Sequence, residues 1–124
     1  GSTHQSVSEQ INELYLTIAE DERLSKLVSE MIQNPNLRES LNPTDQLSLD
    51  FTVLTGLRRI ENIYLQHLDG ILSKDAFDRI GMKFYRTKYA KQTWEKYKGG
   101  FDSNFVLFFV KFRDESIFQI PIIN

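Results

Sequence analysis

The chain contains no cysteine, and this absence excludes disulfide bonds, zinc–thiolate sites and cysteine nucleophiles. Histidine occurs only at His4 and His67, without the Glu-x-x-His spacing of helical di-iron sites, so we expect no metal and no cofactor. The sequence also lacks a G-x-S-x-G elbow and a glycine-rich phosphate loop. These absences favour a protein that is not an enzyme, and we assign no catalytic residue.

Long hydrophobic runs are also missing, since no stretch approaches the ~20 continuous apolar residues of a membrane span. The 124 residues suit a single domain over residues 1 to 124, and 40% hydrophobic and 26% charged residues are typical of a globular protein. Gly1-Ser2 resembles the remnant of an expression tag, so we expect the natural protein to extend further upstream.

The periodicity of apolar residues predicts helices and no strands. The clearest start is Asn42-Pro43-Thr44-Asp45, which combines a cap, a proline for the first helical position and a carboxylate for the positive helix end. Gly70 then marks the end of a long helix. We predict an all-α fold, a compact bundle of five or six helices around a long central third helix. The expected helices cover residues 5 to 19, 22 to 33, 43 to 69, a fourth that starts after Ser73 and contains Gly81, 88 to 98, and 104 to 113.

The sixth helix and the tail are unusually apolar. Four phenylalanines line one side of this helix, and Val106, Leu107 and Val110 cover most of the rest. The tail, residues 117 to 124, is rich in isoleucine. Large exposed apolar patches mark interaction sites, so we expect the tail either to fold back over the sixth helix or to pack in a homodimer. The four phenylalanines are Phe105, Phe108, Phe109 and Phe112.

The long helix carries two charges where its pattern calls for apolar residues. One row with a seven-residue repeat contains Glu61, and the adjacent row contains Arg58. The two are three residues apart and therefore face each other on the helix surface. A charge on an apolar stripe costs several kcal/mol unless it is paired. The two rows are Leu47, Leu54, Glu61 and Leu68, and Phe51, Arg58 and Leu65.

Three interpretations of this region remain open from the sequence. The first is a buried polar network that fixes helix register, with Glu61 paired to Arg58. The second is a small-ligand pocket between helices, with Arg58, Glu61, Asn62 and Tyr64 as binding residues. The third is acid or base chemistry at Glu61, which Arg58 would oppose by stabilising the charged carboxylate. Gln66 is expected on the opposite, solvent-facing side of the helix.

Charge is distributed unevenly along the chain, although the net charge is only −2. Residues 1 to 50 hold nine acidic and three basic residues, a balance of −6, whereas residues 83 to 98 hold six basic and one acidic residue, a balance of +5. We expect the two segments to lie near one another. Aromatic residues within the basic segment also permit an anionic-lipid surface, while the mildly acidic chain argues against nucleic acid.

The order of these signals resembles a set of uncharacterised bacterial proteins with one N-terminal transmembrane helix. Those proteins carry a short helical domain with a Glu-Asn-x-Tyr-x-Gln stretch, a Trp-rich helix and a Phe-Ser-x-x-Phe turn. The resemblance implies that this domain is the part that follows a membrane anchor. We expect an interaction or scaffolding domain with an unknown protein partner, on the cytoplasmic side. The resemblance implies no activity, and this chain departs from the pattern in having one tryptophan. The matching residues run from Arg59 to His67, with Gly70-Ile71-Leu72, Trp94-Glu95, Gly100-Phe101 and Ser103-Asn104-Phe105 after them.

Overall fold

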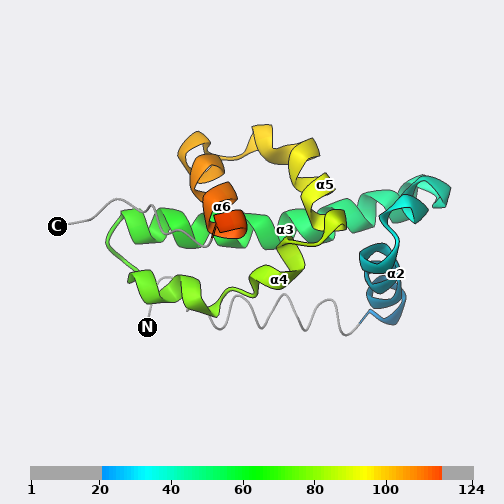
Figure 1. Ribbon diagram of the computed structural model, residues 1–124, viewed down its shortest axis with the longest axis horizontal. Helices are drawn as coiled ribbons and strands as arrows, with labels where there is room; N and C mark the ends of the chain where they lie inside the picture. The colour runs from blue at the N-terminus through cyan, green and yellow to red at the C-terminus, as the bar shows by residue number, and fades with distance from the viewer. Residues whose placement is uncertain (1–20, 116–124) are drawn as a thin grey trace.

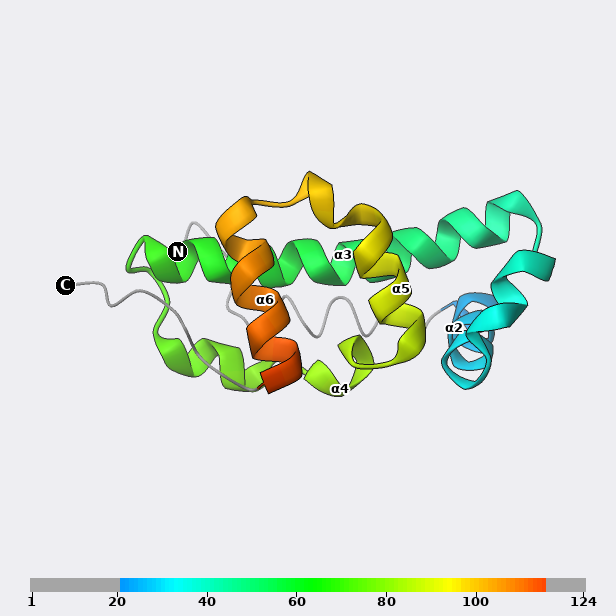
Figure 2. The same cartoon turned by 45° about the horizontal axis from the view of Figure 1, so that its top comes forward.

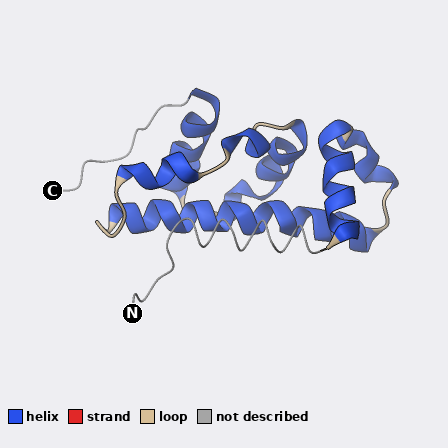
Figure 3. Cartoon of the chain, turned by 90° about the horizontal axis from the view of Figure 1, so that it is seen from below, coloured by secondary structure: helices blue, strands red, loops and turns tan. Residues whose placement is uncertain are grey.

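A computed structural model describes residues 21 to 115 of the chain, and within that range the fold is all-α, as predicted (Figures 1 and 3). The helix expected over residues 5 to 19 and the tail from residue 117 lie outside the described residues. Three 3₁₀ helices join the α-helices. In order, the elements are α2 (Glu22–Gln33), η1 (Pro35–Ser40), α3 (Pro43–Leu68), η2 (Lys74–Arg79), α4 (Met82–Tyr85), α5 (Lys88–Tyr97), η3 (Lys98–Gly100) and α6 (Ser103–Glu115).

The long central helix begins and ends where its capping residues predict. The Asn42 side chain accepts a hydrogen bond from the Asp45 backbone N–H at 2.8 Å, and Pro43 occupies the first turn. At the other end, Gly70 adopts φ 77° and donates to the His67 carbonyl, while Ile71 donates to the Gln66 carbonyl. This pair of bonds is a Schellman motif, which requires a left-handed residue that glycine supplies without strain.

The other elements are arranged along α3. Helices α5 and α6 cross it on one side, α2 lies at its N-terminal end, and the chain returns through η2 and α4 (Figures 1 and 2). The buried stripe of α3 is Leu49, Val53, Leu57, Ile60 and Ile63. The rows predicted from the seven-residue repeat are therefore not the core face. Leu47 and Phe51 are exposed, because the stripe two residues further along the chain faces α5 and α6.

Aromatic rings fill the space between α3 and the helices that cross it. The predicted phenylalanine face of α6 is confirmed, since all four rings are buried. Trp94 of α5 contacts Phe109 with ring centroids 4.6 Å apart, and Tyr64 of α3 stacks on Phe108 at 4.8 Å. Such contacts add to the free energy gained from burying the rings. Leu107, on the outer side of α6, is 68% exposed.

The continuous fourth helix expected after Ser73 is wrong. The segment forms η2 and then α4, and Gly81 is the residue before α4 rather than a position inside a helix. Ile80 and Met82 are both buried. Residues two apart on an α-helix point about 200° apart, so a continuous helix would expose one of them. The extended backbone of Ile80, at φ −87° and ψ 124°, turns both side chains inward.

The glycine that ends α3 gives a test of this fold. We expect Gly70→Ala to lower the free energy of unfolding by about 1 kcal/mol, because alanine disfavours the left-handed conformation. Gly99→Ala is the matched control, since an added Cβ there meets no atom within 4 Å. Urea unfolding of both variants measures the difference. Equal stability of the two variants would contradict the Schellman ending.

Candidate functional site

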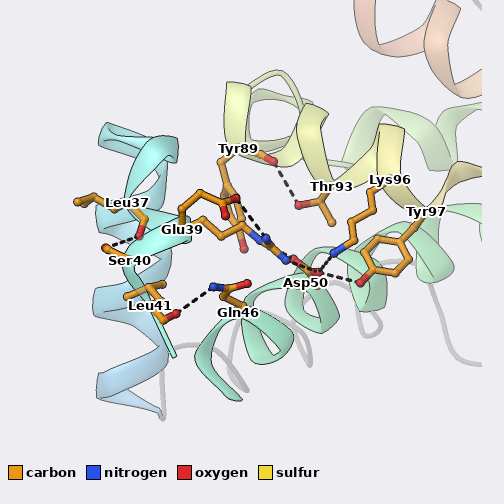
Figure 4. A network of polar contacts seen from close by, with 11 residues as sticks. Leu37, Glu39, Ser40, Leu41, Gln46, Asp50, Tyr89, Thr93, Lys96 and Tyr97 are labelled. Carbon is orange, nitrogen blue, oxygen red and sulfur yellow. Dashed lines mark hydrogen bonds and ion pairs between the residues drawn. The ribbon is translucent and has the colours of Figure 1, made fainter. Parts of the chain in front are cut away.

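The most completely buried carboxylate in the described fold belongs to Asp50, in the second turn of α3. Asp50 is 2% exposed, and its two carboxylate oxygens accept four hydrogen bonds (Figure 4). Arg38 donates from Nε to Oδ1 at 3.3 Å and from Nη2 to Oδ2 at 3.0 Å. Lys96 Nζ and the Tyr97 hydroxyl donate to Oδ2 at 3.2 and 2.7 Å. We call Arg38, Asp50, Lys96 and Tyr97 the Asp50 cluster.

The cluster joins three elements that are distant in sequence. Arg38 comes from η1, Asp50 from α3, and Lys96 and Tyr97 from the end of α5. Beside it, the buried Tyr89 hydroxyl donates to the Leu49 carbonyl at 2.8 Å and links α5 to α3 again. The Asp50 cluster thus holds the N-terminal half of α3 to both its neighbours.

Electrostatics favour the charged form of Asp50 despite its burial. Desolvation raises the pKa of its carboxyl, but the hydrogen bonds from Tyr97, Arg38 and Lys96 outweigh it and hold the pKa below the usual value. The hydrogen bond to Asp50 in turn raises the pKa of Arg38. Burial and the nearby Asp50 charge raise the pKa of Tyr89, so this hydroxyl stays protonated and donates.

Little of the Asp50 carboxylate is accessible to a substrate, because the residue is 2% exposed. A carboxylate offers about two lone-pair sites on each oxygen. Three donors converge on Oδ2, and Arg38 Nε binds Oδ1. A general base needs a free lone pair within reach of the proton that it removes. The Asp50 carboxylate is buried away from such a proton, and its bonds join three elements and tie helices together.

The predicted pair of Arg58 and Glu61 does form, but at the surface. Arg58 Nη1 donates to Glu61 Oε1 at 3.0 Å; the side chain of Glu61 is 12% exposed and that of Arg58 is 52% exposed. Arg58 Nη2 donates to the Gly100 carbonyl at 2.8 Å, and its guanidinium lies 4.0 Å from the centre of the Phe101 ring. Glu61 Oε2 accepts from the Asp102 backbone N–H at 2.7 Å.

These contacts place the pair against the connection between α5 and α6. Both Glu61 oxygens and both terminal nitrogens of Arg58 bind protein atoms, so the pair holds residues 100 to 102 on α3. The other two residues of the expected ligand pocket do not join it. Asn62 is exposed, whereas Tyr64 is 3% exposed and packs into the aromatic core.

Gln66 departs from its predicted place on the solvent side. Gln66 is 9% exposed, and its backbone carbonyl accepts hydrogen bonds from the backbone N–H groups of Ile71 and Leu72. Gln66 is therefore buried on a side of α3 that periodicity had left to solvent. The side-chain oxygen of Gln66 is buried with no hydrogen-bond partner in the structure.

Residues 21 to 115 contain no group of three or more His, Cys, Asp or Glu side chains that could hold a metal ion. Over the same residues, no helix is both long enough and apolar enough to cross a membrane.

Comparison with models of protein families, with curated proteins and with solved structures finds no match for the chain.

Sequence reasoning missed the Asp50 cluster, although one signal pointed to it. Asp50 lies between Leu49 and Val53, which belong to the buried stripe of α3. Had this stripe been identified from the sequence, Asp50 would have stood out as a buried charge that needs partners. The expected proximity of the acidic and basic segments is realised here, because Lys96 pairs with Asp50.

The pKa of Asp50 predicts a specific loss of stability in acid. Because its pKa is lower in the folded than in the unfolded state, its contribution is present above the unfolded value, about pH 4, and is lost as pH falls through the folded pKa. We expect Asp50→Asn to lower the free energy of unfolding at pH 7 by about 2–3 kcal/mol, because Arg38 loses its buried partner. Urea unfolding from pH 7 to pH 2 should show wild type and variant converging. A constant difference across this range would contradict the assignment.

The surface pair should contribute less than a buried one. Because Arg58 is half-exposed, we expect a coupling of about 0.5–1 kcal/mol with Glu61 in a double-mutant cycle of Arg58→Met and Glu61→Gln. Thermal unfolding at low and high salt measures the coupling, and high salt should reduce it. A coupling of about 3 kcal/mol, insensitive to salt, would show that the pair behaves as a buried one.

Proposed function

We propose that this domain is a helical protein-interaction or scaffolding module, whose contact surface is the outer face of α3. This face consists of Leu47, Phe51, Leu54 and Leu65. Leu47, Phe51 and Leu54 follow the three- and four-residue spacing of a helix that pairs with another helix, and Leu65 lies on the same side of α3 about three turns further along. A partner that presents an amphipathic helix fits such a surface.

The observation that carries the proposal is the exposure of this face beside a well-packed core. Leu47 is 49% exposed and Phe51 55%, one turn apart on the same side of α3. Leu54 lies on the next turn and is partly buried, and Leu65 is 37% exposed further along. Single exposed apolar residues are ordinary, but a row of them over successive turns is typical of an interface.

The two polar clusters of α3 support the same conclusion. Asp50 is buried and accepts four hydrogen bonds, and Arg58 and Glu61 bind the connection between α5 and α6. Small-molecule sites need convergent polar groups that remain available to a ligand. The use of these residues inside the fold leaves the apolar face as the stronger candidate for function.

A different protein fits this face better than a second copy of the chain. Two α3 helices matched over residues 47 to 68, in either direction, would bring their Arg58 side chains close together. Like charges at the centre of an interface disfavour association. We therefore propose a heterologous partner, with the homodimer as the competing outcome. Tethering to a membrane through an upstream segment, on the cytoplasmic side, stays a prediction from the resemblance.

Site-specific photocrosslinking tests the proposal. With benzoylphenylalanine at position 51 of the protein in its native cells, we expect a discrete adduct. Leu47→Glu, which places a charge on the same face, should reduce it about tenfold or more, the loss expected for ~1.4 kcal/mol. Leu107→Glu is the control, because Leu107 is equally apolar but lies on the exposed side of α6.

The mass of the adduct distinguishes the occupants. An adduct of twice the chain mass would identify a second copy and overturn the heterologous partner. No adduct, or one that Leu47→Glu leaves unchanged, would contradict the outer face of α3 as the contact surface.

A further inference from the structure

Three cations from three parts of the chain converge on one carboxylate at the C-terminal end of α6. Arg113 binds the neighbouring Asp114 through its Nε at 2.7 Å and its Nη2 at 3.0 Å. Lys91 of α5 places its Nζ 3.9 Å from Asp114 Oδ1. Arg86, the residue that follows α4, donates from Nε to the Arg113 carbonyl at 2.8 Å, where α4 and the end of α6 lie side by side (Figure 2). We call Arg86, Lys91, Arg113 and Asp114 the Asp114 cluster.

The Asp114 cluster carries more positive charge than its carboxylate balances. Three cations and one anion leave an excess of two positive charges. The hydrogen bonds from Arg113 and the positive charges of Arg113, Lys91 and Arg86 outweigh desolvation and hold the pKa of Asp114 below its usual value. Arg113 is 6% exposed, so water screens its charge less than that of a surface lysine. Glu115, the next residue of α6, is exposed and forms no ion pair within residues 21 to 115.

The fold leaves several N–H groups of this cluster unused. Within residues 21 to 115, the exposed Arg86 donates only through Nε, and neither of its terminal nitrogens makes a hydrogen bond. Lys91 Nζ is too far from Asp114 for a hydrogen bond, and the Lys91 side chain is 45% exposed. Arg113 Nη1 is buried with no hydrogen-bond partner in the structure. Capping of the C-terminal end of α6 accounts for Arg86 Nε, but not for the free N–H groups of Arg86 and Lys91.

An anion with two charges and several acceptor oxygens complements this arrangement. A phosphomonoester carries about −1.5 to −2 charges at pH 7 and has three acceptor oxygens. Arginine binds phosphate through two parallel N–H groups, and lysine binds it as a point charge. A carboxylate would duplicate the group that Asp114 already supplies, and a phosphodiester of nucleic acid carries only one charge.

We infer that the Asp114 cluster is a binding site for a phosphomonoester group. The terminal nitrogens of Arg86 and Nζ of Lys91 donate to the phosphate oxygens. The buried Arg113 adds positive charge and holds Asp114 in place, and the Asp114 carboxylate opposes the ligand through like charge. This site is independent of the protein partner proposed for α3.

Titration of the ¹⁵N-labelled 124-residue chain, followed by NMR, tests the site. With glycerol 3-phosphate at constant ionic strength, we expect saturable shifts of the amides around Arg86, Lys91 and Asp114, with a Kd on the order of 1 mM. Dimethyl phosphate, which has one charge, should bind about tenfold more weakly or less. Vesicles that contain phosphatidic acid present the same group on a lipid. Tighter binding to these vesicles would identify a lipid headgroup as the source, and binding to glycerol 3-phosphate alone would identify a soluble ligand.

Two substitutions should change the affinity in opposite directions. Lys91→Gln removes a donor that makes no hydrogen bond within the described fold, and it should weaken binding about tenfold. Asp114→Asn removes the opposing charge and should strengthen binding severalfold. Lys26→Gln and Glu22→Gln are the matched controls, because they make the same charge changes at exposed positions of α2, away from the end of α6 (Figure 1). Both controls should leave the affinity unchanged.

Three results would overturn the site. Equal losses in Lys91→Gln and Lys26→Gln would show attraction by net charge alone. A lower melting temperature in Lys91→Gln with unchanged affinity would show that Lys91 only ties α5 to α6. No saturable shift at about 50 mM glycerol 3-phosphate, well above the expected Kd, would show that the cluster binds no phosphomonoester.

Discussion

The Asp50 carboxylate is the interaction on which the arrangement around α3 most depends. A buried charge is tolerated only when hydrogen bonds and opposite charges replace the water that it has lost. The four donors come from η1 and from the end of α5, so satisfying this one group fixes the position of both elements on α3. The direction of the Asp50 pKa shows that the replacement succeeds, because the charged form is favoured in spite of burial.

Glu61 has a similar role about three turns further along α3, where we expect a smaller contribution to stability. Its partner Arg58 is half-exposed, and the two together hold the backbone of Gly100 and Asp102. Each of these two acidic residues of α3 thus binds a connection or helix end that apolar packing alone would leave free to slide. Apolar contacts are non-directional, whereas these hydrogen bonds specify register.

Charge pairing also divides the surface of the molecule. Arg38, Arg58 and Lys96 form ion pairs with carboxylates of α3, whereas no ion pair within residues 21 to 115 involves Lys83 or Lys88. Apolar exposure shows a comparable division, since the inner stripe of α3 is fully buried and Leu47 and Phe51 are half-exposed. Groups that the fold does not use are the ones available for partners, and this is why both proposals rest on them.

Local chemistry in the sequence determined the helical class, the bounds of α3 and the phenylalanine face of α6. Caps and periodicity act within a few residues, so Asn42 and Gly70 could be assigned without knowledge of their surroundings. The pairing of Glu61 with Arg58 was predictable for the same reason, because the two are one turn apart.

Only the tertiary structure decided which face of α3 is buried, that Gln66 is covered, and that the segment after Ser73 breaks before α4. α3 carries apolar residues on two faces, and sequence periodicity could not tell which one α5 and α6 would cover. The Asp50 cluster depends on contacts between residues 12 to 47 positions apart. Such contacts leave no periodic trace in the sequence, because they form only when α5 is placed across α3.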